Sequence, residues 1–118
     1  LEAGADPLIA IEADARFAAG LRAWPEAQAA AGRPPRLMVV EADALAVDEA
    51  ELIEGATGGG DVVGPPVLVV GNLPYNVATP LLVKWLKAGA WRGPMALMFQ
   101  KEVAMRICAA PDQAAYGR

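Results

Sequence analysis

The sequence predicts an α/β fold with a mostly parallel, doubly wound sheet. Short runs of apolar residues alternate along the chain with segments of helical periodicity, which is the pattern of successive β-α-β units. The apolar runs are continuous rather than interleaved with polar residues, as in strands buried on both faces. The predicted strands cover residues 8–11, 37–40, 67–70 and 95–99.

Two helices are predicted before the third strand. The first covers residues 13–21, because Phe17 and Leu21 recur at i, i+4 spacing and Pro25 stops the pattern. A short acidic helix is predicted over residues 48–53.

Two further helices are predicted in the second half. One covers residues 79–87 and another begins near Lys101. The apolar face of the helix over 79–87 is formed by Leu81, Leu82, Trp85 and Leu86.

Length and composition limit the class of protein. A chain of 118 residues holds at most one small domain, and 55% hydrophobic residues exclude disorder. No apolar run approaches the roughly 20 residues that span a bilayer, and the first residues lack the basic and apolar regions of a signal peptide. We therefore expect a soluble, cytoplasmic protein with no membrane partner.

The scarcity of histidine and cysteine excludes several chemistries. The chain has no histidine and a single cysteine, Cys108, so the usual zinc ligand sets and histidine-based triads are not available. We expect no metal site, and we expect Cys108 to be a buried structural thiol in a helical stretch.

Charge is distributed unevenly along the chain. Residues 1–71 hold four Lys/Arg and twelve Asp/Glu, a net −8, whereas residues 72–118 hold six Lys/Arg and two Asp/Glu, a net +4. A basic second half suits a protein that faces phosphates there, although ordinary solvated helix faces would give the same count.

The most informative segment follows the third predicted strand. Asn72, Leu73, Pro74 and Tyr75 stand where a strand opens into a loop, the usual place for ligand chemistry in such a sheet. The Asn72 carboxamide can accept from an amino group, Pro74 stiffens the turn, and Tyr75 offers a face for a planar ring. The structural alternative is a simple turn in which Asn72 caps the next helix and Tyr75 packs in the core.

Acidic residues end the first two predicted strands. Glu12 closes the first, and Glu41-Ala42-Asp43-Ala44 follows the second. Carboxylates at such ends can accept hydrogen bonds from ribose hydroxyls, and Asp43 lies where an acid could meet an adenine amino group. Each acid could instead be a helix cap or a solvated loop residue.

The order of these motifs resembles the ribosomal RNA adenine dimethyltransferase family. The resemblance covers essentially the whole chain and rests most specifically on the Asn-Leu-Pro-Tyr-Asn turn and on a Gln-Lys-Glu-Val run. Its segments are Ile9-Ala10-Ile11-Glu12-Ala13-Asp14, Glu41-Ala42-Asp43-Ala44, Gly71-Asn72-Leu73-Pro74-Tyr75-Asn76-Val77-Ala78-Thr79-Pro80, Phe99-Gln100-Lys101-Glu102-Val103-Ala104-Met105-Arg106 and Ala115-Tyr116-Gly117-Arg118.

The resemblance implies an enzyme with a Rossmann-like methyltransferase fold. Such enzymes use S-adenosyl-L-methionine to place two methyl groups on the N6 of each of two adjacent adenosines in a small-subunit (16S) rRNA hairpin, during ribosome maturation. The implied partner is small-subunit rRNA or the immature 30S subunit, and the implied state is a monomer.

The resemblance implies a role for each residue of this chain that matches a site residue of the family. Glu12 resembles the residue that holds the cofactor ribose, and Asp43 with Ala44 the pair beside the cofactor adenine. Asn72 resembles a catalytic residue that also borders the cofactor. Leu73 and Pro74 would then offer backbone carbonyls, with Tyr75 stacking on the target adenine. Lys101 and Arg106 are candidate phosphate contacts.

The chain also departs from that family. No glycine-rich cofactor loop stands between a strand and a helix, so residues 1–118 are expected to be part of a catalytic domain, without the C-terminal helical RNA-binding domain. The family's first strand would lie between the strands ending at Glu12 and Asn72, so its loss predicts two half-sheets with exposed inner edges. We expect these 118 residues alone to be inactive and to bind S-adenosylmethionine weakly; micromolar binding by calorimetry would contradict this.

Other functions remain open at this stage. A related rRNA adenine methylase of the macrolide-resistance type shares the turn, and a non-catalytic RNA- or DNA-binding assembly factor could share the fold. A nicotinamide-dependent oxidoreductase could use Glu12 for its ribose, but it would have no use for the turn at Asn72 to Tyr75.

Overall fold

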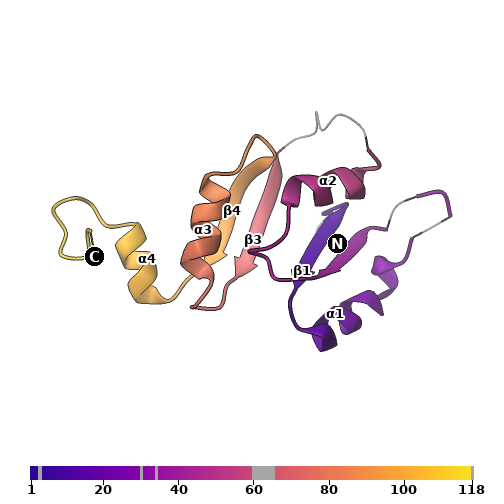
Figure 1. Cartoon of the computed structure of the whole chain (residues 1–118), viewed down its shortest axis with the longest axis horizontal. Helices are drawn as coiled ribbons and strands as arrows, with labels where there is room; N and C mark the ends of the chain where they lie inside the picture. Colours follow the sequence, from indigo (N-terminus) through magenta and orange to yellow (C-terminus); the bar gives the residue numbers. More distant parts are fainter. Residues whose placement is uncertain (3, 30, 34, 60–65, 118) are drawn as a thin grey trace. The chain divides into compact units, whose positions relative to one another are not determined.

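The computed structural model describes residues 1–2, 4–29, 31–33, 35–59 and 66–117 (Figure 1). The chain divides into two compact units, Leu1–Gly64 and Pro65–Arg118. Each unit contains a parallel strand pair joined through a helix, so the alternating β-α architecture is confirmed within each of them.

Unit 1 is built around the parallel pair of β1 and β2. Its elements are β1 (Leu8–Glu12), α1 (Ala15–Arg22), a 3-10 turn η1 (Pro25–Ala27), β2 (Leu37–Glu41) and α2 (Glu49–Thr57). The register runs from Leu8 opposite Leu37 to Glu12 opposite Glu41. Because the strands are parallel, their carboxyl ends, and the acidic residues there, meet at one edge of the sheet.

Aspartates fix where both helices of unit 1 begin. The Asp14 side chain accepts from the Arg16 backbone N–H at 2.9 Å, and the Asp48 side chain accepts from the Glu51 N–H at 3.2 Å. Each bond satisfies a donor that the first helical turn leaves unpaired. The end of α2 is set by Gly58, which adopts a left-handed conformation with φ 83°.

The buried core of unit 1 is small. Its buried side chains are Ala18, Leu37, Ile53 and Ala56. The predicted apolar face of α1 was wrong at Phe17, which is 64% exposed. Ala18 lies about 100° further round the helix and is the residue that packs inward, because its small side chain allows close approach to the strands. The Arg16 guanidinium instead lies 6.0 Å from the Phe17 ring centroid.

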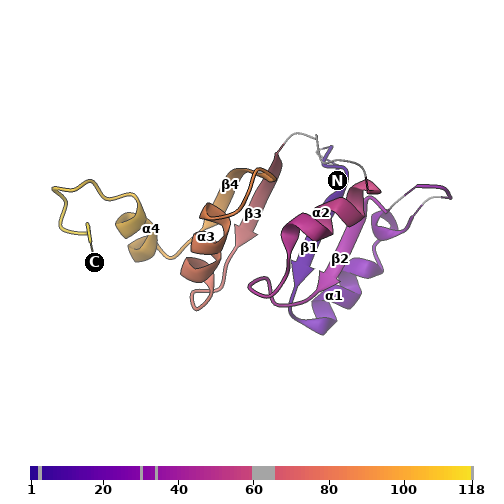
Figure 2. The same cartoon turned by 45° about the horizontal axis from the view of Figure 1, so that its top comes forward.

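Unit 2 repeats the strand-helix-strand arrangement and adds a short helix. Its elements are β3 (Val67–Asn72), α3 (Ala78–Leu86), β4 (Arg92–Met98) and α4 (Lys101–Ile107). The strands β3 and β4 pair in parallel, and α3 lies beside them in both views (Figures 1 and 2). The strand β3 was predicted over residues 67–70. It extends two residues beyond that predicted end and includes Asn72.

The fourth strand begins three residues before its predicted start. Val67 lies opposite Arg92 but Val69 lies opposite Met95, so β4 places one extra residue against β3. This irregularity accommodates Pro94, which has no N–H to donate to a ladder. Gly93 beside it avoids crowding, because a Cβ there would lie 3.0 Å from both the Cβ and the carbonyl oxygen of Pro66.

The expected burial of both sheet faces is wrong for β3 and β4. Burial alternates along both strands, with Leu68 59%, Val70 72% and Met98 64% exposed. The opposite face carries the half-buried Val69 and Leu97, because α3 covers one side of the pair and the other side faces outward.

The predicted face of α3 was correct at Leu81 and Trp85, which are 2% and 6% exposed. Leu86 was assigned wrongly, since it is 58% exposed. Ala78 completes the buried stripe, at the i, i+3, i+7 spacing of a helix that packs along one side.

Cys108 is exposed, so its prediction as a buried thiol was wrong. It follows α4, a seven-residue helix with no buried residue, and therefore has no core to enter.

Within the described residues the strands form two separate two-stranded sheets, β1–β2 and β3–β4. This agrees with the two half-sheets that the sequence predicted. No helix of the described part is both long and apolar enough to cross a membrane.

Candidate functional site: a strand-end amide and two strand-end carboxylates

Asn72 is the last residue of β3 and lies opposite Met98 of β4. After it the chain turns into α3, and the backbone N–H groups of Val77 and Ala78 both donate to the Pro74 carbonyl at 3.1 Å. The Pro74 carbonyl oxygen therefore accepts hydrogen bonds from the N-cap residue and the first residue of α3. From the sequence we had expected this oxygen to be an acceptor for a ligand. Of the acceptors proposed from the sequence, the Asn72 side chain and the Leu73 carbonyl are left for a ligand.

The polar and aromatic groups of this turn are accessible. Asn72 is exposed, Tyr75 is 78% exposed, and Leu73 between them is half-buried. The purely structural alternative is wrong on both counts, because Tyr75 does not enter a core and Val77, not Asn72, is the N-cap of α3. An exposed amide and an exposed ring three residues apart can contact the edge and the face of one planar ligand.

Glu12 holds a defined position at the end of β1. Its Oε1 accepts from the Asp14 backbone N–H at 2.9 Å, and the residue is half-buried. The cap of α1 is Asp14 and not Glu12, so the cap alternative for Glu12 is wrong. A carboxylate has acceptor sites on both oxygens, so Glu12 can hold further donors such as ribose hydroxyls.

Asp43 shapes the loop that leaves β2. Its Oδ1 accepts from the Leu45 N–H at 2.9 Å, and its carbonyl accepts from the Ala46 N–H at 2.9 Å. Asp43 is exposed and Ala44 is half-buried. The cap of α2 is Asp48, so Asp43 is a turn residue at the same sheet edge as Glu12.

One ion pair beside Glu12 was missed from the sequence. Arg22, in the last turn of α1, donates from Nη1 to Glu41 Oε2 at 3.2 Å. The ion pair could have been predicted from the sequence, because a basic residue ends the helix that connects two strands, and both of these strands end in glutamate.

A second ion pair stands at the start of α1. Arg16 Nη2 lies 2.8 Å from Asp14 Oδ2. The Arg16 side chain, followed by its backbone N–H, lowers the pKa of Asp14, and the same carboxylate raises the pKa of Arg16.

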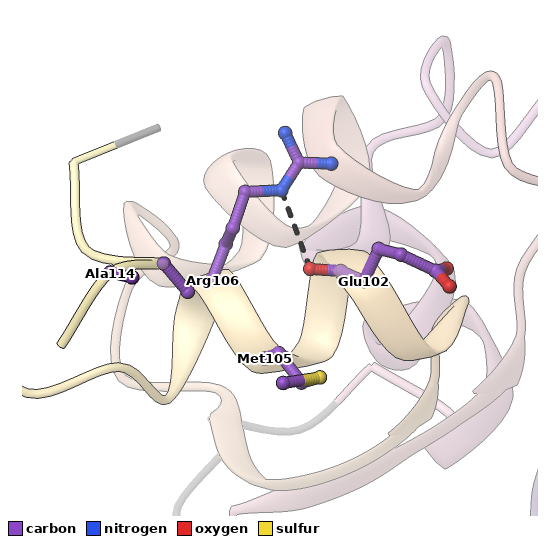
Figure 3. A pocket seen from close by; sticks show the side chains of 5 residues that line it. Glu102, Met105, Arg106 and Ala114 are labelled. Carbon is purple, nitrogen blue, oxygen red and sulfur yellow. Dashed lines mark hydrogen bonds between the residues drawn. The ribbon is translucent and has the colours of Figure 1, made fainter.

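Lys101 and Arg106 both lie on α4 and are exposed. Arg106 donates from Nε to the Glu102 carbonyl at 3.3 Å, which leaves its terminal nitrogens pointing away from the helix (Figure 3). Arg106 also lines an open pocket of about 430 Å³ together with Glu102, Met105, Ala114 and Ala115.

The predicted site residues thus fall into two sets. Glu12, Asp43 and Ala44 belong to unit 1, whereas the Asn72–Tyr75 turn belongs to unit 2 with Lys101 and Arg106. In the described part of the chain no three His, Cys, Asp or Glu side chains gather as metal ligands.

Comparisons with known proteins agree on one family. The family model described as ribosomal RNA adenine dimethylase matches residues 2–118. The chain is 46% identical over 121 residues to a ribosomal RNA small subunit methyltransferase A of Sinorhizobium medicae, and 49% identical over 119 residues to one of Phenylobacterium zucineum. All of this chain is covered in both cases, but only 39% and 36% of the two relatives.

A third relative extends the same result. The chain is 48% identical over 119 residues to a ribosomal RNA small subunit methyltransferase A of Maricaulis maris, covering 37% of that protein. The chain therefore spans between a third and two fifths of the length of these relatives. On the strength of the family match over residues 2–118, the chain belongs to the ribosomal RNA adenine dimethylase family.

Proposed function

We propose that the full-length gene product carrying this chain methylates RNA. It would transfer methyl groups from S-adenosyl-L-methionine to the N6 of two adjacent adenosines in a small-subunit rRNA hairpin. The observation that carries the proposal is the exposed Asn72–Tyr75 turn at the carboxyl end of β3. Residues 1–118 would form part of the catalytic domain of that enzyme.

The turn supplies what methylation of an amino group requires. The lone pair of the adenine amino nitrogen is delocalised into the ring, so this nitrogen is a poor nucleophile. Acceptors for its N–H groups favour the tetrahedral geometry in which the lone pair is available. The Asn72 side-chain oxygen and the Leu73 carbonyl are suited to this task, because the Pro74 carbonyl already accepts from Val77 and Ala78.

The ring of Tyr75 would hold the target base. Base–aromatic stacking contributes about 1–3 kcal/mol per base. A side chain that is 78% exposed gives up no core packing when it stacks on a ligand. The base must be unpaired or flipped to reach the turn, which suits a hairpin loop.

The strand-end acids of unit 1 fit the cofactor. Glu12 would accept from the ribose hydroxyls, and Asp43, beside Ala44, from the adenine amino group. S-adenosylmethionine, when bound, supplies a methyl group already activated by a positively charged sulfur. The protein therefore needs positioned acceptors more than a strong base, which suits a chain without histidine.

The basic second half would face the RNA. Lys101 and Arg106 are exposed on α4, and the terminal nitrogens of Arg106 are directed outward (Figure 3). These side chains would bind phosphates and position the RNA without reading its sequence.

The relatives favour this activity over the alternatives. Those cited above carry the name of a small-subunit methyltransferase, not of a resistance methylase or an assembly factor. Asn72 also retains the amide that catalysis needs and that RNA binding alone would not.

The test is to incubate the full-length gene product with unmethylated small ribosomal subunits and isotope-labelled S-adenosylmethionine. Mass spectrometry of the digested rRNA should show labelled N6,N6-dimethyladenosine. Large-subunit RNA in a parallel reaction separates the two methylase classes: label there instead would favour the resistance type. Absence of labelled adenosine in both RNAs would remove the proposal.

A further inference from the structure

We infer that Gly71 is a positioning residue that sets the direction of the Asn72 side chain and the placement of the Leu73 carbonyl. The inference rests on the proposed function for its kinetic consequence, but its structural basis is independent. A Cβ at position 71 would lie 2.8 Å from Leu73 Cδ2, 3.4 Å from Leu73 Cγ and 3.4 Å from Leu97 Cδ2. The Leu73 side chain therefore occupies the space that any other residue at position 71 would need.

The pleat of β3 places Asn72 and the Gly71–Leu73 contact on opposite faces of the strand pair. Along β3 the residues alternate, so Val69 and Gly71 point to the half-buried face and Val70 and Asn72 to the exposed face. Leu73 follows the strand, yet its side chain folds back over Gly71 and towards Leu97 on the half-buried face. The Leu73 side chain anchors the start of the turn, and Asn72 is directed outward.

The backbone conformation of Gly71 does not require glycine. Its φ is not positive, in contrast to Gly58 with φ 83°. Alanine is therefore allowed at position 71 as far as the backbone is concerned, and only the contact with Leu73 opposes it. A separation of 2.8 Å is too short for two carbon atoms, so the end of the Leu73 side chain must move aside. The turn then loses the side chain that anchors it over Gly71, which is how the substitution would reach the Leu73 carbonyl.

A shift of this turn should affect the reaction more than binding of the cofactor. The acceptors for the amino group lie at Asn72 and Leu73, directly beside the contact. Asn72 is also expected to border the cofactor, but the carboxylates proposed to hold the cofactor's ribose and adenine belong to unit 1. Misplacing reacting groups by about 1 Å can cost on the order of 100-fold in rate. We expect Gly71→Ala to lower kcat by about 10- to 100-fold and to change the Kd of S-adenosylmethionine by less than about 3-fold.

The decisive experiment is a double-mutant cycle in the full-length gene product. Leu73→Val removes the Cδ atoms that meet the new Cβ while keeping the backbone carbonyl. Gly71→Ala should therefore cost at least about 5-fold less in kcat in the Leu73→Val background than in the wild type. Equal losses in both backgrounds, or no loss in either, would overturn the inference.

Two other glycines provide matched controls. Gly93→Ala also introduces a crowded Cβ in a strand, 3.0 Å from Pro66 and Val67, but away from the turn. It should lower the melting temperature without lowering the kcat of the folded fraction, and Leu73→Val should not rescue it. Gly20→Ala, on α1 where a Cβ meets nothing within 4 Å, should leave kcat unchanged and raise the melting temperature slightly, because alanine favours a helix more than glycine does.

A readout without activity separates this inference from the proposed function. The same cycle measured on melting temperature should show that Leu73→Val reduces the destabilisation caused by Gly71→Ala. An inactive wild type would count against the proposed function alone, because this coupling would still report the contact. Additive melting-temperature changes would overturn the contact itself.

Discussion

Glu12 and Glu41 lie opposite each other as the last residues of β1 and β2, and only Glu41 is bound by Arg22, at 3.2 Å. Two carboxylates at neighbouring strand ends would repel each other without a cation nearby. Arg22 offsets the charge of Glu41, while Glu12 Oε1 is fixed by the Asp14 N–H at 2.9 Å. The two glutamates therefore have different roles, although they end the two strands of one parallel pair.

This difference predicts unequal effects of removing each charge. In the full-length gene product, Glu12→Gln should weaken binding of S-adenosylmethionine by about 10- to 150-fold, since hydrogen bonds to charged groups contribute about 1.5–3 kcal/mol. Glu41→Gln should change the affinity by less than about 3-fold, because it removes only an exposed ion pair. Calorimetric titration measures both, and similar losses for the two variants would contradict the assignment of the ribose contact to Glu12.

Tyr75 should contribute to RNA methylation without contributing to folding. Tyr75→Ala should lower kcat/KM for the RNA by about 5- to 150-fold, the range that corresponds to one stacked base. Tyr75→Phe keeps the ring and should stay close to wild type. Melting temperatures should be unchanged in both, because the side chain is 78% exposed. A defect in Tyr75→Phe as large as that in Tyr75→Ala would show that the hydroxyl, and not stacking, is what matters.

The stability of unit 2 should depend on one face of α3. Leu81→Ala should lower the free energy of unfolding by about 2–5 kcal/mol, because Leu81 is 2% exposed and its removal leaves a cavity. Leu86→Ala, on the same helix but 58% exposed, should cost less than about 0.5 kcal/mol. Urea denaturation of the two variants checks this, and equal losses would mean that Leu86 is covered.

The start of α1 should respond to acid. Arg16 holds the pKa of Asp14 below its ordinary value, so this ion pair stabilises the fold above that value and is lost as the pH falls through the lowered pKa. Arg16→Ala should move the Asp14 pKa upward, as measured by NMR of its carboxyl carbon. The stability difference between wild type and Arg16→Ala should be present at neutral pH and should vanish in acid; a difference that persists in acid would point to another cause.

Much of the fold could be predicted because apolar runs and helical spacing are local properties. The strands at residues 8–11 and 37–40 were each predicted to within one residue of β1 and β2. The start of β4 was missed because Gly93 and Pro94 look like a loop, whereas pairing with β3 accommodates them in an irregularity. Which face of a helix or strand is buried depends on neighbours far along the chain, and so Phe17 and Leu86 were assigned wrongly.

The residues of the candidate site could be predicted from the sequence, but the contacts of their side chains could not. The Asn72–Tyr75 turn and the acids at Glu12 and Asp43 stand at strand ends, which the sequence pattern locates directly. The contact between Gly71 and Leu73 depends on how a side chain folds back on its own strand. No residue pattern encodes that direction.

The central claim is that the Asn72 amide accepts from the amino group of the target adenine. The most direct test counts methyl groups transferred to small-subunit rRNA by Asn72→Ala and by Asn76→Ala, a matched amide four residues along the same turn. A lost preorganised hydrogen-bonding group typically costs about 100- to 1,000-fold in rate. The account predicts a loss of that size for Asn72→Ala and near wild-type transfer for Asn76→Ala. Transfer by Asn72→Ala within a few-fold of wild type would contradict it.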